Sequence, residues 1–326
     1  MNQIETIGLR RRGLLTGAVA LGALGFGGLV QAKAPLLGTQ APYWYRFRIG
    51  AFEATIVSDG QLPLGSPTAA FLGVTKAEID TMLSANFLPS DNAVLEQNVL
   101  VVNTGERVIV FDTGMGKSEM FGKKTGRLMA NLRAAGIDPA SVDAVVATHA
   151  HVDHIGGIAE DGKALFPNAQ VYIAQADLEF WTDEGKLGGP MKAFVEMARS
   201  NLLPVRDRIV FYKDGQEFLP GIVAMAAHGH TVGHTMFVIT SGGQSLTYVG
   251  DLTHHQVLLL EKPLTEFAYD TDPKAAAQTR VRYLNSFAAN RTTVLAYHFP
   301  FPGIGNIAKA GDGFRYFPRP MDMQPG

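Results

Sequence analysis

Three histidines and one aspartate lie within six consecutive residues, and this cluster constrains the fold more than any other feature of the chain. The segment HAHVDH at 149–154 directly follows an apolar run that is typical of a buried strand. Imidazole nitrogens and carboxylate oxygens are ligands that suit zinc and similar divalent ions. Because alternate residues of an extended segment face one side, His149 and His151 can hold one ion. Asp153 and His154, which the loop turns the other way, can hold a second.

The composition narrows the chemistry that such a cluster can perform. The chain has no cysteine, so disulfides, thiolate nucleophiles and sulfur ligands are excluded. Any metal must therefore be held by nitrogen and oxygen ligands. The 326 residues, 46% of them hydrophobic, are enough to bury a large core. The formal net charge is −2 and no basic stripe stands out, so the sequence predicts no nucleic-acid partner.

The first residues of the chain, 1–34, have the form of an export signal. Three arginines at 10–12 precede an uncharged stretch at 13–30, and the segment AKA at 32–34 supplies the small residues of a cleavage site. The segment RRGLL at 11–15 resembles a twin-arginine signal. An uncleaved membrane anchor is the alternative, because the uncharged stretch approaches the length of a membrane span. Its many glycines make it weakly hydrophobic, so we expect cleavage, no stable membrane insertion afterwards, and a periplasmic or secreted mature protein.

The mature chain, 35–326, alternates apolar runs with turn and helix signals and shows no break in composition. Such mixing predicts a single α/β domain built of layers. The segment TKAE at 75–78 has the form of a capping box and opens a predicted helix that runs to about residue 85. Further helices are expected at 126–135, 177–181, 191–201 and 273–289. Strands are expected at 47–57, 98–103, 107–111, 142–148, 171–174, 209–212, 222–227, 245–249 and 293–297.

The histidine cluster resembles the HxHxDH signature of the metallo-β-lactamase superfamily. The other parts of that family's pattern occur in the expected order, each behind a predicted strand. The segment GHTVGH at 229–234 matches the family's GHTPGH except for Val232, and Asp251 and His298 match the two later motifs. The resemblance implies a four-layered αββα sandwich, with the metal site at one edge of two mixed sheets.

The resemblance also implies which residues bind the metals. One ion takes His149, His151 and His234, the other takes Asp153, His154 and His298, and Asp251 bridges the two. Two divalent ions are therefore expected. Zinc is the first choice, although a site of nitrogen and oxygen ligands also accepts manganese, cobalt or iron. This chain has Val232 where the family has proline, and the difference affects only the rigidity of a turn.

Three further residues are expected behind the ligands. Asp59, Asp112 and His230 can orient ligand imidazoles, as outer groups of metal sites do. For the two aspartates, a structural role in a turn is an equal alternative. We expect His254 and His255 to be ordinary loop residues.

Several stretches between about 43 and 318 are similar to methyl parathion hydrolase and its lactonase-like relatives, above all the segment HFPFPGIG at 298–305. In that group an aromatic pocket beside the metals receives the leaving group, and Phe121 and Trp181 stand at the matching positions. Ordinary core packing is the alternative for both aromatic residues. The resemblance further implies a small-molecule substrate and a homodimer.

These features together predict a hydrolase that uses two metal ions and a bridging hydroxide to cleave lactones, activated esters or organophosphate triesters. Asp153, which can orient the nucleophile or move a proton, and Asp251, which bridges the ions, are the expected catalytic carboxylates. Three alternatives stay open. A β-lactamase is disfavoured by Asp251, since β-lactamases with this motif usually lack the bridging aspartate. The others are an iron-dependent sulfur-oxidising or oxygenase member of the superfamily and a catalytically silent binding protein.

Overall fold

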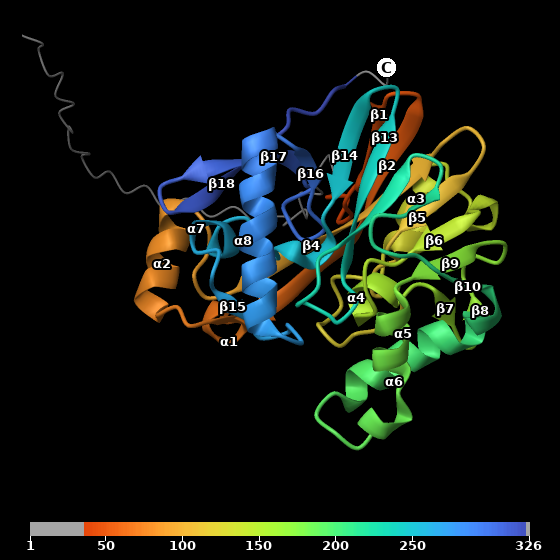
Figure 1. Cartoon of the computed structure of the whole chain (residues 1–326), viewed down its shortest axis with the longest axis horizontal. Coiled ribbons are helices and arrows are strands. Elements are labelled where there is room, and N and C mark those ends of the chain that lie inside the picture. The colour runs from red at the N-terminus through yellow and green to blue at the C-terminus, as the bar shows by residue number, and fades with distance from the viewer. Residues whose placement is uncertain (1–35, 324–326) are drawn as a thin grey trace, which may run out of the picture. The chain divides into compact units, whose positions relative to one another are not determined.

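Two seven-stranded sheets form the framework of the chain (Figure 1). The computed structural model describes residues 36–323, and those from Ala41 onward form one unit. The predicted signal at 1–34 lies outside the described residues. No helix among residues 36–323 combines the length and the apolar character that crossing a membrane requires.

The first sheet has an antiparallel half and a parallel half. In spatial order its strands are β1 (Trp44–Ile49), β2 (Phe52–Gly65), β4 (Ala93–Asn103), β5 (Val108–Phe111), β6 (Ala144–Val146), β9 (Gln170–Ile173) and β10 (Ile209–Phe211). Strands β1, β2, β4 and β5 pair antiparallel, whereas β5, β6, β9 and β10 run parallel.

The second sheet is also mixed. In spatial order its strands are β11 (Glu217–Leu219), β12 (Ile222–Ala226), β13 (Thr235–Ser241), β14 (Gln244–Tyr248), β16 (Thr293–Leu295), β17 (Ile304–Ala310) and β18 (Gly313–Pro318). Only β14 and β16 pair parallel, and all other neighbours are antiparallel. The parallel pair matters for the site, because the chain leaves both strands at the same edge of the sheet.

Helices cover the two sheets. They are α1 (Pro67–Ala70), α2 (Lys76–Ala85), α3 (Leu128–Ala134), α4 (Val152–Ile155), α5 (Gln175–Thr182), α6 (Lys192–Leu202), α7 (Leu258–Glu261) and α8 (Pro273–Asn290). Helix α8 crosses the second sheet (Figure 1), where its Leu284 and Phe287 pack against Val294 of β16 and Ile307 of β17. Short strands β3 (Phe71–Leu72) and β15 (Glu266–Phe267) pair beside α1.

The main core lies between the sheets. Val99 of β4 and Val110 of β5 share one cluster of buried side chains with Phe237 of β13 and Tyr248 of β14. The central strands are apolar without interruption and therefore buried on both faces, as parallel strands between two layers require. The predicted α/β architecture of two mixed sheets with helices outside them is confirmed.

Local signals in the sequence place most elements, with small shifts of their ends. The prediction of a single strand at 47–57 is wrong, because the chain turns at Gly50 and Ala51 and forms the antiparallel pair β1 and β2. Thr75 caps α2, and its side chain and that of Glu78 form the predicted capping box. The predicted strand at 98–103 is longer than expected, because β4 begins at Ala93. The second half of the histidine cluster, predicted to lie on a loop, forms the helical turn α4 instead. That turn redirects Asp153 and His154.

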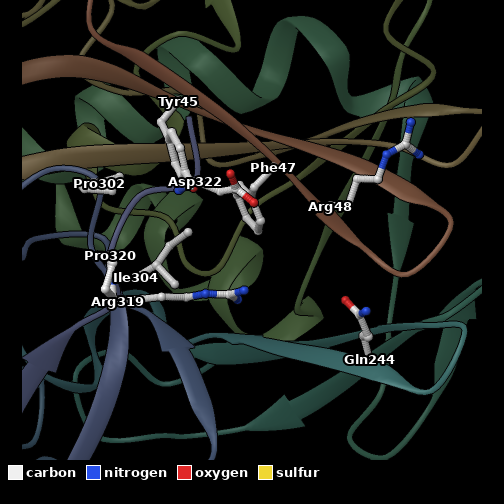
Figure 2. A pocket seen from close by; sticks show the side chains of 9 residues that line it. All are labelled: Tyr45, Phe47, Arg48, Gln244, Pro302, Ile304, Arg319, Pro320 and Asp322. Carbon is white, nitrogen blue, oxygen red and sulfur yellow. Dashed lines mark hydrogen bonds between the residues drawn. The ribbon is translucent and has the colours of Figure 1, made fainter. Parts of the chain in front are cut away.

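A surface pocket has none of the histidines in its lining (Figure 2). It lies where β1 meets the C-terminal segment. Its lining comprises Tyr45, Phe47, Arg48, Gln244, Pro302, Ile304, Arg319, Pro320 and Asp322.

Candidate metal centre

The histidine cluster lies where several chain segments leave the two sheets. His149 and His151 follow β6, and His230 lies on the connection between β12 and β13. Asp251 follows β14 and His298 follows β16, so the parallel pairing of these two strands delivers both residues to one edge. His149 and His298, which are 149 positions apart in the sequence, therefore lie at the same edge.

Asp251 occupies the middle of the cluster, with one carboxylate oxygen toward each half. Its Oδ1 is 3.2 Å from His154 Nε2 and 3.3 Å from His298 Nε2. Its Oδ2 is 3.2 Å from His230 Nε2 and 3.7 Å from His149 Nε2. This is the arrangement that a carboxylate shared by two ions needs.

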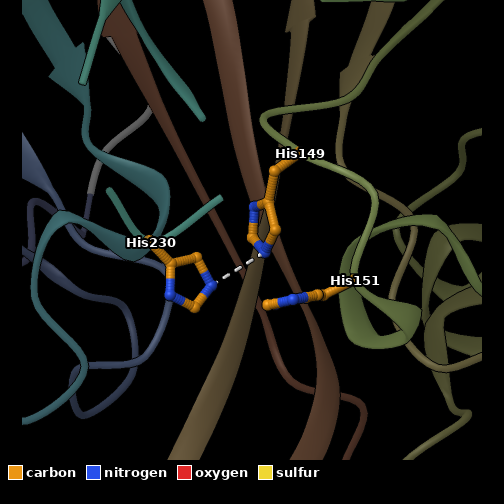
Figure 3. A group of neighbouring side chains, drawn as sticks. All are labelled: His149, His151 and His230. Carbon is orange, nitrogen blue, oxygen red and sulfur yellow. Dashed lines mark hydrogen bonds between the residues drawn. The ribbon is translucent and has the colours of Figure 1, made fainter. Parts of the chain in front are cut away.

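The ligand atoms form groups of three whose members lie within 4.8 Å of one another. One group is His149, His151 and His230, which come from two separate segments and point toward a common centre (Figure 3). A second group is Asp153, His154 and His298. All of these residues are buried.

The residues present fit divalent metal ions. Among the described residues, His154 Nε2 and Asp251 Oδ1 are buried and have no hydrogen-bond partner. A buried polar atom without a partner costs about 1–3 kcal/mol, and a cation between such atoms removes that cost. Imidazole and carboxylate donors without sulfur match zinc and its neighbours.

His234 was predicted as the third ligand of the first ion, and the structure does not fit this prediction. Its Nδ1–H donates to the carbonyl of Ala227 at 2.9 Å, and its Nε2 accepts the backbone N–H of Asp251 at 2.9 Å. Burial lowers the pKa of His234 to about 3, so the ring is neutral. Because both of its nitrogens already form hydrogen bonds, neither is free to bind a metal ion. Gly250 permits this contact, since a Cβ there would lie 2.8 Å from His234 Nε2.

His230 occupies the place that the prediction gave to His234. Its Nδ1–H donates to Asp270 Oδ1 at 2.8 Å, which leaves Nε2 facing His149 Nε2 at 3.1 Å. Although burial opposes it, hydrogen bonds to Asp251 and Asp270 raise the pKa of His230 to about 9 in the metal-free protein. The prediction that His230 stands behind the ligands is corrected accordingly. Both histidines of GHTVGH follow the same strand, so spacing alone could not separate them.

Asp112 lies where it was expected. Its carboxylate accepts the Nδ1–H of His154 at 2.9 Å and the backbone N–H of Thr148 at 2.8 Å. The hydroxyl of Tyr248 also donates to it, at 3.1 Å. Asp112 therefore fixes which nitrogen of His154 faces the cluster, in the way that outer carboxylates orient metal-binding histidines.

Asp59 takes its alternative role, a structural one. Its carboxylate accepts backbone N–H groups of Met115 at 2.9 Å, Gly126 at 3.0 Å and Leu128 at 2.8 Å. The structure gives it no contact with a ligand imidazole. Asp59 instead organises the loop that carries Phe121.

Three residues of the site were missed by the sequence analysis. Asp177 binds the two histidine-bearing segments together, since it accepts the N–H groups of Ala150 and Gly233 at 2.7 Å each. Asp270 supports His230 by accepting its Nδ1–H. Neither aspartate lies in a recognisable motif, because each acts over a long separation in sequence.

His254 is the third missed residue, having been expected to be a loop residue. It is buried, with Nε2 3.0 Å from Asp251 Oδ2, and its ring stacks on Phe267 with centroids 4.0 Å apart. The neighbouring His255 does match its expected structural role, since its Nδ1 accepts the backbone N–H groups of Val257 and Leu258. The pair HH thus contains one site residue and one turn residue, which the sequence could not distinguish.

An apolar pocket opens onto the cluster. Its apolar and aromatic lining consists of Leu62, Leu64, Leu95, Phe121, Phe194, Phe267 and Tyr269. Phe121 is in the pocket, as predicted. Trp181 is not: it is only 2% exposed and packs edge-to-face against His151, with centroids 4.8 Å apart. Phe194, which also contacts Trp181, is the lining residue on that side.

Comparisons with known proteins agree with this geometry. The model of the metallo-β-lactamase superfamily matches residues 93–298. The dizinc quorum-quenching lactonase AidC superposes with a TM-score of 0.80 at 28% identity, covering 86% of this chain and 98% of AidC. The hydrolase AbOPH superposes with a TM-score of 0.81 at 30% identity, covering 87% of this chain and all of AbOPH.

Curated relatives are more distant. A ribonuclease of Thermus thermophilus is 29% identical over 167 residues, which are 49% of this chain and 36% of the ribonuclease. A probable metallo-hydrolase of Mycobacterium tuberculosis is 22% identical over 229 residues, which are 62% of this chain and 69% of that protein. The chain thus spans little more than a third of that ribonuclease. With the family model matching more than half of its length, the chain belongs to the metallo-β-lactamase superfamily of metal-dependent hydrolases.

Proposed function

We propose that the protein is a two-metal hydrolase that cleaves lactones or other activated esters carrying an apolar group. The observation that carries this proposal is the position of Asp251, whose two carboxylate oxygens each face a different group of histidines. In this proposal one ion is held by His149, His151 and His230, the other by Asp153, His154 and His298, and both by Asp251. The similarity to the lactonase AidC supports the substrate class.

When bound, two such ions supply Lewis acidity and make water acidic enough to attack near neutral pH. The residues of the chain do the rest. Asp153 lines the pocket and lies 3.4 Å from His298 Nε2, so its carboxylate can orient the attacking water and take its proton. The apolar lining holds the apolar part of the substrate and excludes bulk water from the reacting centre.

The charge of the pocket favours neutral substrates. Its lining among the described residues includes no lysine or arginine. A nuclease site needs cationic side chains along the phosphate backbone, so the activity named for the Thermus relative is not favoured here. Organophosphate triesters are the second candidate, because they are uncharged and because Phe121, Phe194 and Phe267 can receive an aryl leaving group.

A substrate panel tests the proposal. Values of kcat/KM are measured on the metal-loaded protein with an aryl lactone, an acyl-homoserine lactone, a methyl phosphotriester and a cephalosporin. We expect turnover of a lactone or of the phosphotriester, and little turnover of the cephalosporin. Turnover of the cephalosporin alone would overturn the substrate class.

A further inference from the structure

A buried arginine stands behind the metal centre, on helix α8. The guanidinium of Arg280 is inaccessible to solvent. Its Nε donates to the carbonyl of Leu252 at 3.0 Å, and its Nη1 donates to the carbonyls of Pro263 at 2.9 Å and Thr265 at 2.8 Å. Burying a charged group is costly unless it is paired and hydrogen-bonded, so a wholly buried arginine needs a specific reason.

The remaining nitrogen of this guanidinium faces a carboxylate of the site. Nη2 of Arg280 lies 3.7 Å from Oδ2 of Asp270, and neither atom has a hydrogen-bond partner. The other oxygen of Asp270 accepts the Nδ1–H of His230 at 2.8 Å. Arg280, Asp270 and His230 therefore form a continuous line that ends at the metal-facing Nε2 of His230.

A second line runs from Arg280 to the bridging carboxylate. Leu252, whose carbonyl accepts from Arg280 Nε, directly follows Asp251 in the chain. The backbone N–H of Asp251 is itself fixed by His234. Hydrogen bonds thus hold the backbone on both sides of the Asp251 side chain. His234 binds the N–H of Asp251, and Arg280 binds the carbonyl of Leu252.

We propose that Arg280 is a positioning residue for the metal centre, acting through Asp270 on His230 and through Leu252 on Asp251. Arg280 orients the Asp270 carboxylate, which in turn holds the proton of His230 on Nδ1 and leaves Nε2 free to bind metal. This inference rests on the assignment of His230 and Asp251 as ligands in the proposed function. A purely structural role, in which Arg280 only ties α8 to the segment 252–265, is the competing explanation.

Metal affinity distinguishes the two roles. Zinc affinity is measured by chelator competition on the purified full chain, with Arg280→Met, Arg280→Lys, Asp270→Asn and the double variant Arg280→Met/Asp270→Asn. The matched control is Arg282→Met, which changes an exposed arginine of the same helix that stacks on Tyr283. We expect Arg280→Met and Asp270→Asn each to weaken zinc binding by about 10–100-fold, most strongly for the ion assigned to His230, which is the range seen when outer partners of metal ligands are lost. The double variant should be no weaker than the more severe single variant, and the control should match the wild type.

A spectroscopic readout separates positioning from loss of stability. With cobalt(II) in place of zinc, we expect the absorption bands of one ion to change in Arg280→Met and Asp270→Asn and to stay the same in Arg282→Met. Unchanged zinc affinity and spectra in a folded Arg280→Met, or losses that simply add in the double variant, would overturn the proposal. If Arg280→Met does not fold, Arg280→Lys alone and combined with Asp270→Asn serves the same comparison. A wild type that binds no zinc would overturn the proposed function as well. If the wild type binds zinc and is active, and the Arg280 variants have the same zinc affinity and spectra as the wild type, only the inference about Arg280 is overturned.

Discussion

At the scale of single residues, the site depends on which nitrogen of each imidazole is left free. The Nδ1 of His154 is bound by Asp112, that of His230 by Asp270, and that of His298 by the carbonyl of Glu96. Each of these contacts turns Nε2 toward the cluster. His234 differs because both of its nitrogens bind backbone groups, and this makes it a structural residue despite its place in the motif.

Replacement of His230 and of His234 by alanine should affect different properties, metal binding in the first case and stability in the second. We expect His230→Ala to remove a metal ligand, so that the protein keeps its fold but loses one ion and most of its activity. His234→Ala leaves the N–H of Asp251 without a partner and should lower the free energy of unfolding of the metal-free protein by about 1–3 kcal/mol. Metal content and chemical denaturation in chelator measure the two effects. Full metal content in His230→Ala, together with a stable, metal-depleted His234→Ala, would restore the sequence-based assignment.

Substitutions of the two aromatic residues predicted for the pocket should also differ in their effects, on KM for Phe121 and on stability for Trp181. Phe121→Ala removes an apolar wall of the pocket and should raise KM for apolar substrates by about 10-fold, with little change in kcat or stability. Trp181→Ala opens a cavity in the core and should cost about 3–5 kcal/mol of stability. Steady-state kinetics and denaturation compare them, with Phe87→Ala, which changes a 97% exposed residue, as the control. An unchanged KM in Phe121→Ala contradicts the role of Phe121 as a wall of the substrate pocket.

At the scale of elements, short signals set most helices and strands, but the turns that shape the site do not follow from them. The capping box of α2 was predicted because its two partners lie three residues apart. Helix α4 was not, since its four residues are too few to show a helical pattern. Its helical turn exists because the segment is buried against neighbouring elements, and it is this turn that aims Asp153 and His154.

The start of α2 should make a pH-dependent contribution to stability. The ammonium of Lys262, followed by the N–H and hydroxyl of Thr75, lowers the pKa of Glu78 from its ordinary 4.5 to about 2. A lowered carboxyl pKa stabilises the fold above the ordinary value, and the stabilisation is lost as the pH falls from 4.5 toward 2. Glu78→Gln should therefore unfold at lower denaturant concentration than the wild type at pH 7, and the difference should shrink below pH 4.5. Glu106→Gln, in an exposed turn, is the control, and a difference that does not depend on pH contradicts the prediction.

At the scale of the whole molecule, the site joins both sheets and helix α8, so metal binding should be coupled to global stability. Metals that bind only the folded state stabilise it by about 4 kcal/mol at a thousand times Kd. We expect chelation to lower the melting temperature, and added zinc to restore it. Calorimetry with and without chelator measures this shift, for which Asp251→Ala, lacking the shared carboxylate, should show a smaller response. Identical melting temperatures with and without metal would contradict the coupling.

Export of the folded protein to the periplasm or beyond, cleavage of the signal and assembly into a homodimer stay predictions from the sequence. N-terminal sequencing of the secreted form tests the first two. Sedimentation of the mature protein tests the third.

The sequence by itself determined the fold class and the centre of the site. The segment HAHVDH carries its chemistry in adjacent residues, and Asp251 and His298 each follow a strand that the apolar pattern reveals. Local patterns suffice wherever the interacting groups are neighbours in the chain or where a strand delivers a residue to a known edge.

Only the tertiary structure decided which residues complete the site. His230 instead of His234, the support from Asp177 and Asp270, the position of His254 and the burial of Trp181 all depend on contacts between segments far apart in the chain. His149 and His230, for example, are 81 residues apart in the chain, and their Nε2 atoms lie 3.1 Å from each other. Such contacts follow from the orientation of each ring in a packed interior, because hydrogen bonds to one nitrogen decide where the other points, and no spacing along the chain encodes that orientation.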